Sequence, residues 1–377
     1  MWEPQGMYSK FILKQPTILF GENALTGLKS YPSSRVVVIH GTSLKSEYKV
    51  KVEKSISAFE VVFIEKDWKG EPSIESLSTA LSIVEKVKPD IVIAIGGGSV
   101  IDGAKMIRTY YEFPFFDIRE TKFSMMTWKT AFIAMPTTIG SGAEISSSAV
   151  MYNAKKKSKE FIISHQFIPE IIVLDSELIQ DAPVSLLLSS MVDALSHCIE
   201  GYLSRVDNIL IDVFAEKAIG VFSELYQMIG KTNKGEVLNR LQLASVFAGM
   251  VQNHCIVGAA HSLAHQMTSY GLSHSDAIAL FLPTVIKKNI EKPETLKRFE
   301  NLAVKSGFSK GNELLSFVEN VVSLCDLGIP RQILKSKKNE ILADSTLFTR
   351  ALSDKGGQGN PTSMDTDYLQ TIFKDSI

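Results

Sequence analysis

The chain has 377 residues, more than the roughly 250–300 at which a single hydrophobic core stops growing, so two domains are expected. Its 40 basic and 41 acidic residues give a formal net charge of -1, which argues against a nucleic-acid-binding surface. Three cysteines without a CxxC pair form no disulfide framework and indicate a reducing, cytoplasmic environment.

No targeting or membrane segment is expected. Residues 1–14 are polar and mixed, without the apolar centre of a signal peptide. The chain also lacks an uninterrupted run of about 18 apolar residues, the length that indicates a transmembrane helix.

The first half alternates two kinds of pattern. Runs rich in valine and isoleucine, typical of buried strands, occupy residues 35–40, 60–65, 90–95 and 131–135. Helical patterns occupy residues 44–58, 73–87 and 99–109. This alternation predicts a parallel α/β sheet.

Beyond Pro183 the strand-like runs almost disappear. Helices are expected at residues 185–203, 209–229, 238–252 and 259–270. With the boundary near residues 178–184, the prediction is an α/β domain over residues 1–180 and an all-helical domain over 181–377.

Gly96, Gly97, Gly98 and Ser99 follow the third predicted strand and open a helix. Glycines let a backbone approach a pyrophosphate closely, and a helix N-terminus offers unpaired N–H groups. The serine is expected to cap that helix. The alternative is a tight strand-to-helix turn without a ligand, in which Asp102 and Lys105 would be solvated charges.

Asp193 and His197 are four residues apart and share one face of a largely apolar helix. A buried carboxylate beside a buried imidazole needs a partner. A simple Asp–His hydrogen bond would satisfy both groups, whereas a metal ion would need further ligands.

Further histidines occur downstream, at positions 254, 261, 265 and 274. With Asp193 and His197 they suggest a carboxylate–imidazole site for zinc or Fe²⁺ with one open position. Composition cannot decide between His261 and His265, and His254 is interpreted as a core residue. Cys198 and Cys255 each follow a histidine, but nothing in the sequence indicates an activated thiol.

Taken together, these motifs make the chain resemble the iron-containing (group III) alcohol dehydrogenase family over nearly its whole length. The matching segments are FGENAL at 20–25, GGGSVIDGAK at 96–105, PTTIGSGAE at 136–144, DALSHCIE at 193–200, GAAHSLAHQM at 258–267, LPTVIKKN at 282–289 and NP at 360–361. The chain has Ser273-His274-Ser275 where the family usually has Pro-His-Gly.

The resemblance implies a Rossmann-like dinucleotide-binding domain, an all-helical metal domain and an active site in the cleft between them. It assigns the metal ligands to Asp193, His197, His261 and His274, and gives His265 a place beside the substrate, in proton transfer. The cofactor-binding residues that it implies are Gly97, Gly98, Ser99, Asp102, Thr137, Thr138, Ser141 and Lys159.

Cofactor preference is expected to follow from the turn after the first predicted strand. Relatives that prefer NAD often carry an aspartate there, which repels a 2′-phosphate. This chain has Gly41 at that position, with Ser43 and Lys45 nearby. We therefore expect NADP(H) to be preferred over NAD(H).

The expected activity is hydride transfer between nicotinamide C4 and a small alcohol or aldehyde, with Fe²⁺ or Zn²⁺ polarising the oxygen. A homodimer is expected. Two alternatives were weighed: a lyase of the dehydroquinate synthase type, which also uses NAD and a metal, and a non-catalytic metal or nucleotide binder.

Overall fold

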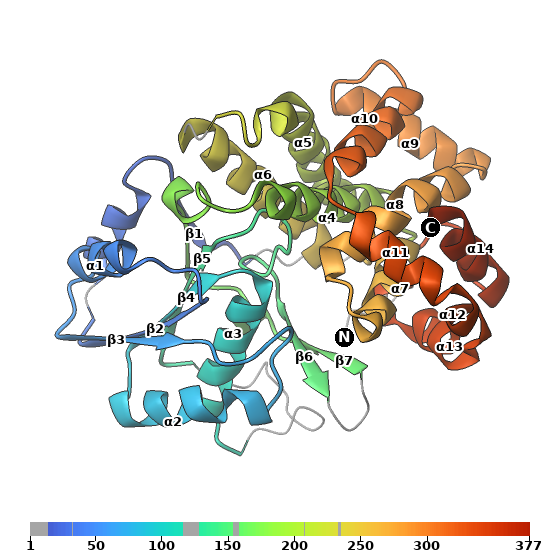
Figure 1. Cartoon of the computed structure of the whole chain (residues 1–377). Coiled ribbons are helices and arrows are strands. Elements are labelled where there is room, and N and C mark those ends of the chain that lie inside the picture. The colour runs from blue at the N-terminus through green and yellow to red at the C-terminus, as the bar shows by residue number, and fades with distance from the viewer. Residues whose placement is uncertain (1–13, 32, 116–127, 154–157, 207, 233–234) are drawn as a thin grey trace, which may run out of the picture. The chain divides into compact units, whose positions relative to one another are not determined.

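The computed structural model describes residues 14–377 except 32, 116–127, 154–157, 207 and 233–234. The N-terminal segment, residues 1–14, for which no signal peptide is expected, therefore lies outside the described residues apart from Lys14. The chain divides into two compact units (Figure 1). The first comprises the described residues of Met1–Thr138 and Ala143–Asp181, and the second comprises Ile139–Gly142 and Ala182–Ile377.

The first unit is built on a six-stranded parallel sheet of order β1-β8-β5-β4-β2-β3. The strands are β1 (Thr17–Phe20), β2 (Arg35–His40), β3 (Glu60–Glu65), β4 (Ile91–Gly96), β5 (Ala131–Pro136) and β8 (Ile171–Leu174). The four strands expected from the sequence are β2 to β5, and each agrees within one residue.

Helices cover both faces of this sheet. Alternate residues of each central strand point to opposite faces, so each strand contributes side chains to both layers. Val37, Ile39 and Val92 pack under α2 (Ser78–Val87) and α3 (Gly98–Glu112). Val36, Val38 and Ile93 pack instead under η1 (Ala24–Ser30) and α1 (Ser46–Ser55). The strands are therefore apolar on both sides, as their valine- and isoleucine-rich sequences indicated.

Four strands were not anticipated from the sequence. β1 and β8 have four residues each and pair with one another across about 150 residues of chain. β6 (Ser148–Asn153) and β7 (Ser158–Ile163) form a separate antiparallel pair.

Every element described in the second unit is a helix, so the expected fold class, an α/β region followed by an all-helical region, is confirmed. The α-helices are α4 (Val184–Leu203), α5 (Ile209–Leu225), α6 (Gly235–His254), α7 (Ala259–Met267), α8 (His274–Asn289), α9 (Pro293–Lys305), α10 (Gly311–Leu324), α11 (Gly328–Ser336), α12 (Lys338–Ala343), α13 (Ser345–Ser353) and α14 (Thr366–Ser376).

Two glycines of the Ile139–Gly142 segment allow it to pack closely onto this unit. A Cβ atom at Gly140 would lie 2.5 Å from the carbonyl oxygen of Ser190 on α4. Gly142 has φ +62, and a Cβ there would lie 2.6 Å from the Cα of Gly249 on α6. Side chains at either position would push the segment away.

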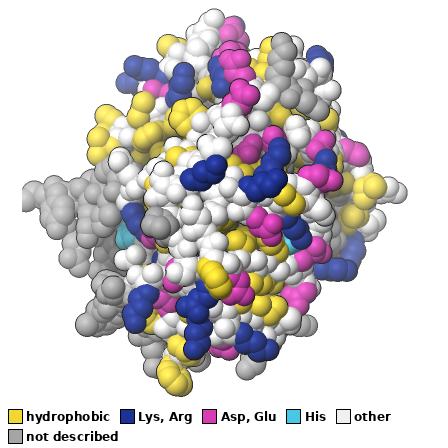
Figure 2. All heavy atoms as spheres, turned by 90° about the vertical axis from the view of Figure 1, so that its left-hand side faces the viewer, with side chains coloured by type: hydrophobic (Ala, Val, Ile, Leu, Met, Phe, Trp, Pro, Cys, Tyr) yellow, Lys and Arg dark blue, Asp and Glu magenta, His cyan; other side chains and the backbone are white. Residues whose placement is uncertain are grey.

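No single helix among the described residues is both long and apolar enough to cross a membrane. The bent pair formed by residues 235–254 and 259–270 reaches that length and hydropathy only jointly, with a 99° bend between its halves. Figure 2 shows basic and acidic side chains interspersed over the surface in view, in keeping with the balanced charge of the sequence.

Candidate active site

The order of the sheet locates a ligand-binding edge in the first unit. The chain runs from β2 outward to β3 and then crosses back to β4 on the other side of β2. Ligands of open parallel sheets bind at the carboxyl ends of the strands where the order reverses. Gly41 follows β2 and Gly97 follows β4, so both lie at this switch point.

Three turns meet at this edge. The N–H of Gly41 donates to Ile95 O at 3.0 Å, and the N–H of Thr137 donates to Gly96 O at 3.1 Å. A Cβ at Gly97 would lie 3.2 Å from Cγ2 of Thr138, a tight contact that glycine avoids.

Ser99 does not cap helix α3, contrary to the expectation from the sequence. Gly97 is the N-cap residue and makes no side-chain capping bond. The Ser99 hydroxyl instead donates to Gly70 O and accepts from the indole N–H of Trp68 at 3.1 Å. The glycines thus leave the first N–H groups of α3 without a side-chain cap, as an anion-binding helix terminus requires.

Asp102 and Lys105 are buried rather than solvated. The Lys105 ammonium donates to Asp102 at 3.3 Å and to the carbonyl oxygens of Ala143, Ser146 and Ser148 at 2.7, 3.1 and 2.7 Å. The second carboxylate oxygen of Asp102 accepts from the N–H of Val150 at 3.0 Å. The pair therefore ties the helix that follows the glycine-rich turn to the segment leading into β6.

Three of the remaining expected cofactor residues have different surroundings. Lys159, on β7, forms an ion pair with Glu71 at 2.5 Å. Ser43 is exposed after β2. Ser141 belongs to the segment that packs with the second unit.

In the second unit, helix α4 carries the carboxylate and the first imidazole. Residues 187–203 of this helix are all buried, so Asp193 and His197 face the interior one turn apart. Asp193 Oδ1 lies 3.8 Å from His197 Nε2.

Two more imidazoles converge on the same oxygen. His261 Nε2, from α7, lies 3.8 Å from Asp193 Oδ1, and His274 Nε2, from the start of α8, lies 3.6 Å from it. The side chains of Asp193, His261 and His274 form a group whose potential ligand atoms all lie within 4.8 Å of one another. His197 lies beside this group, with its ring stacked on that of His261 at 4.9 Å between centroids.

This donor set fits a divalent transition metal. Two donors about 2.1 Å from a tetrahedral ion are roughly 3.4 Å apart, close to the separations observed here. His261 Nε2 is buried and makes no hydrogen bond within the described part of the chain. Such an atom is costly to bury unless it binds a ligand.

The electrostatics of the two stacked imidazoles differ. Burial, aided by repulsion from His261, holds the pKa of His197 well below its usual range, so this ring stays neutral as a metal ligand must. Burial would also lower the pKa of His261, but the hydrogen bond and charge of Glu200 outweigh it and raise that pKa.

Sequence reasoning missed three residues that support the site. Glu200 accepts a hydrogen bond from His261 Nδ1 at 2.7 Å, and Asp354 pairs with His265 Nδ1 at 2.6 Å. Asn360 Oδ1 accepts from the N–H of Ala259 at the start of α7. Glu200 had a detectable signal, because it continues the helical spacing of Asp193 and His197, and Asn360 stands in the NP segment of the family resemblance.

His254 and the three cysteines are not among the candidate metal ligands. His254 Nδ1 hydrogen-bonds Met250 O within α6. All three cysteines are buried, and burial raises the pKa of both Cys198 and Cys325, the latter to about 12. Such thiols are poor nucleophiles at neutral pH.

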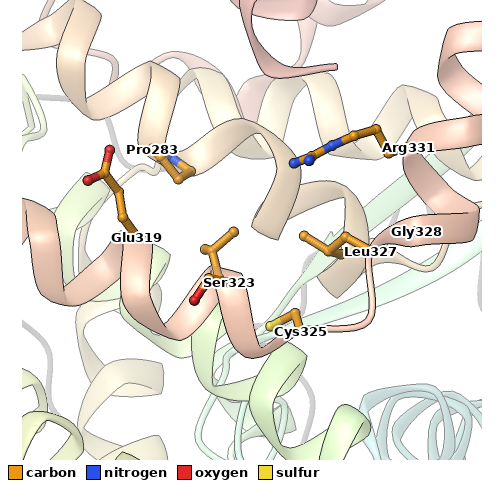
Figure 3. Close-up of a pocket in the computed structure, with 8 residues that line it drawn as sticks. Pro283, Glu319, Ser323, Cys325, Leu327, Gly328 and Arg331 are labelled. Carbon is orange, nitrogen blue, oxygen red and sulfur yellow. The ribbon is translucent and has the colours of Figure 1, made fainter.

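Cys325 also lines a pocket of about 420 Å³ between α8, α10 and the start of α11 (Figure 3). The charged residues that line it are Glu319, which pairs with Lys287 at 2.6 Å, and Arg331. One carboxylate and one protonated thiol do not make a metal site.

Comparison with known proteins agrees with this arrangement. Residues 15–176 match the family described as iron-containing alcohol dehydrogenase, and residues 187–377 match its C-terminal family. The chain is similar to an NADPH-dependent butanol dehydrogenase of Clostridium saccharobutylicum (28% identity, 95% of each chain) and a 1-propanol dehydrogenase of Salmonella typhimurium (25% identity, 96% of this chain and 98% of the relative).

Among solved structures, an iron-containing alcohol dehydrogenase from Thermococcus thioreducens matches with a TM-score of 0.86 at 25% identity, over 97% of this chain and 99% of that one. The family matches cover both units, and the candidate metal ligands lie within the second. The chain therefore belongs to the iron-containing alcohol dehydrogenase family and is a metal-dependent, NAD(P)-linked alcohol dehydrogenase.

Proposed function

We propose that the chain interconverts small primary alcohols and their aldehydes, using NADP(H) and one divalent ion held by Asp193, His197, His261 and His274. The observation that carries this proposal is the convergence of three imidazole Nε2 atoms within 3.6–3.8 Å of Asp193 Oδ1. Butanol and propanol are the substrates named for two relatives, and they support the substrate class.

When bound, the ion would supply Lewis acidity toward the alcohol or aldehyde oxygen, a contribution of several kcal/mol. One carboxylate and three neutral imidazoles leave a divalent ion with net positive charge, which suits this role. We propose Fe²⁺ as the physiological ion and Zn²⁺ as a competent substitute, because both accept this ligand set.

His265 is proposed to exchange the proton with the substrate. Its Nδ1 is held by Asp354, which also accepts from the N–H of Gly356 at 2.8 Å. Burial would raise the pKa of Asp354, but the hydrogen bond and charge of His265 hold it below its usual range. An ionised Asp354 fixes Nδ1 as the protonated nitrogen, and we assign proton exchange to Nε2.

The nucleotide is proposed to bind through the first unit, taken as a domain of residues 1–180, while residues 181–377 form the metal domain. Gly97, Gly98 and the uncapped start of α3 would receive the pyrophosphate. Thr137, Thr138, Ser141 and Lys159 are proposed to line the cofactor. For Ser99 and Asp102 the hydrogen bonds described above support a positioning role in this site.

The NADP(H) preference is supported by Gly41 and by the exposed Ser43 and Lys45, which suit a 2′-phosphate. Lys45 pairs with Asp181 at 2.6 Å, and both side chains are more than half exposed, so the ammonium can exchange this partner for a phosphate. The ratio of kcat/KM for NADPH to that for NADH tests the preference. A ratio below one would overturn it.

We further propose a cytoplasmic homodimer. Sedimentation of the purified chain would give about twice its 41.6 kDa mass if this is right and the monomer mass if it is wrong.

The catalytic proposal is tested by following NADPH absorbance with a panel of linear aldehydes, together with elemental analysis of the protein. We expect about one equivalent of metal per chain and stoichiometric NADPH oxidation. A protein that consumes no NADPH with any aldehyde, or that turns over fully after the metal is stripped, would contradict the proposal.

A further inference from the structure

Glu200 makes two contacts with the helix that carries His261. Its side chain is buried on α4, one turn beyond His197. Oε1 accepts from the N–H of Ala260 at 2.8 Å, and Oε2 accepts from His261 Nδ1 at 2.7 Å. Both carboxylate oxygens are therefore engaged with α7.

The start of α7 depends on this contact, because its N-cap residue, Gly258, has no side chain to cap the helix. Glu200 and Asn360 supply the missing acceptors from other parts of the unit. A Cβ at Gly258 would lie 2.8 Å from an oxygen of each of them, so glycine leaves them room.

The same contact determines which nitrogen of His261 can bind a cation. A neutral imidazole carries its proton on one nitrogen only. A carboxylate can only accept, so the proton of His261 must lie on Nδ1. Nε2 then presents its lone pair toward Asp193 Oδ1, 3.8 Å away.

We propose that Glu200 is a positioning residue for the metal centre: it fixes both the N-terminus of α7 and the Nδ1-protonated form of His261, so that Nε2 faces the ion. The inference rests on the proposed ligand set and adds Glu200 to it as an indirect determinant of metal affinity.

Glu200→Gln separates this role from simple packing. An amide has one acceptor oxygen and one donor group, whereas Ala260 N–H and His261 Nδ1–H both need acceptors. If the amide nitrogen faces His261, the ring proton moves to Nε2 and blocks the ligand atom. If it faces Ala260, the start of α7 loses its cap.

Glu300→Gln is the matched control. Glu300 lies on α9 and accepts from the N–H of Gly311 at 2.6 Å, so it too caps a following helix from outside. A Cβ at Gly311 would likewise lie 2.8 Å from Glu300. No histidine is involved in this contact.

The experiment is a Co²⁺ titration of the metal-stripped full chain in competition with a chelator, with the visible Co²⁺ spectrum and the Tm of the apoprotein recorded for each variant. We expect Glu200→Gln to weaken Co²⁺ binding about 10- to 100-fold and to change the spectrum. Glu300→Gln should lower only the Tm, and Glu200→Asp should give an intermediate affinity.

Unchanged Co²⁺ affinity in Glu200→Gln, or an equal loss in Glu300→Gln, would overturn the inference. If the wild-type chain binds no Co²⁺ at all, the ligand set itself is wrong. Should Glu200→Gln fail to fold, ¹⁵N shifts of the His261 ring in the wild-type apoprotein decide: a proton on Nδ1 supports the proposal, and one on Nε2 contradicts it.

Discussion

Replacing Lys105 by methionine should unfold the first unit at much lower denaturant concentration. The ammonium group is fully buried and has four acceptors within hydrogen-bond distance of its three N–H groups, three of these acceptors being backbone carbonyls. Methionine fills similar space but donates nothing, so those carbonyls and the Asp102 carboxylate lose their partner. Removing one member of a buried ion pair costs about 3–5 kcal/mol, and we expect a loss of that size in the free energy of unfolding.

Urea unfolding followed by tryptophan fluorescence is a suitable assay. Trp68 and Trp128, the tryptophans that the structure describes, both lie in the first unit, so their signal reports on its unfolding, which keeps the transition closer to two-state behaviour. Asp102→Asn should cost less, because the amide can still accept from Val150. The free energy of unfolding lost in the double variant should be smaller than the sum of the two single losses by at least about 0.5 kcal/mol. Independent sites usually add to within roughly that amount. Additive effects, or a loss below about 1 kcal/mol in Lys105→Met, would refute the reasoning.

Three further outcomes follow from individual residues. Burial raises the pKa of Glu144 from 4.5 to about 7 against the opposing effects of its backbone hydrogen bond and Lys105, so the folded state favours the proton. The free energy of unfolding should therefore fall as the pH rises between those values, by about 3 kcal/mol at most. Urea unfolding of Glu144→Gln should no longer show this dependence on pH. Gly142→Ala should lower the free energy of unfolding by at least about 2 kcal/mol, because φ is +62 and the new Cβ meets α6; an unchanged urea midpoint would refute this. Lys45→Ala should raise KM for NADPH but not for NADH, and equal KM changes would contradict the proposed phosphate contact.

The central strands and the helices up to residue 270 could be predicted from the sequence because their signals are local. The runs that form β2 to β5 are apolar on both faces, and α4 carries a continuous buried pattern. β1 and β8 could not be assigned this way, since four-residue strands have no measurable period and are defined by pairing with one another.

The proposed metal ligands divide in the same manner. Asp193 and His197 share a helix, so their spacing alone indicated a common face. The choice between His261 and His265 depends on how α7 packs against α4, which brings His261 Nε2 to 3.8 Å from Asp193 Oδ1. Glu200, Asp354 and Lys105 act through contacts between elements distant in the chain, which periodicity does not record.

The most direct test of the metal site is to measure metal content and NADPH-dependent reduction of butanal together in Asp193→Ala. Asp367→Ala, an exposed change on α14, is the control. We expect Asp193→Ala to lose both bound metal and turnover, while the control keeps both. An Asp193→Ala protein that retains a full equivalent of metal and wild-type kcat would contradict the assignment of this site.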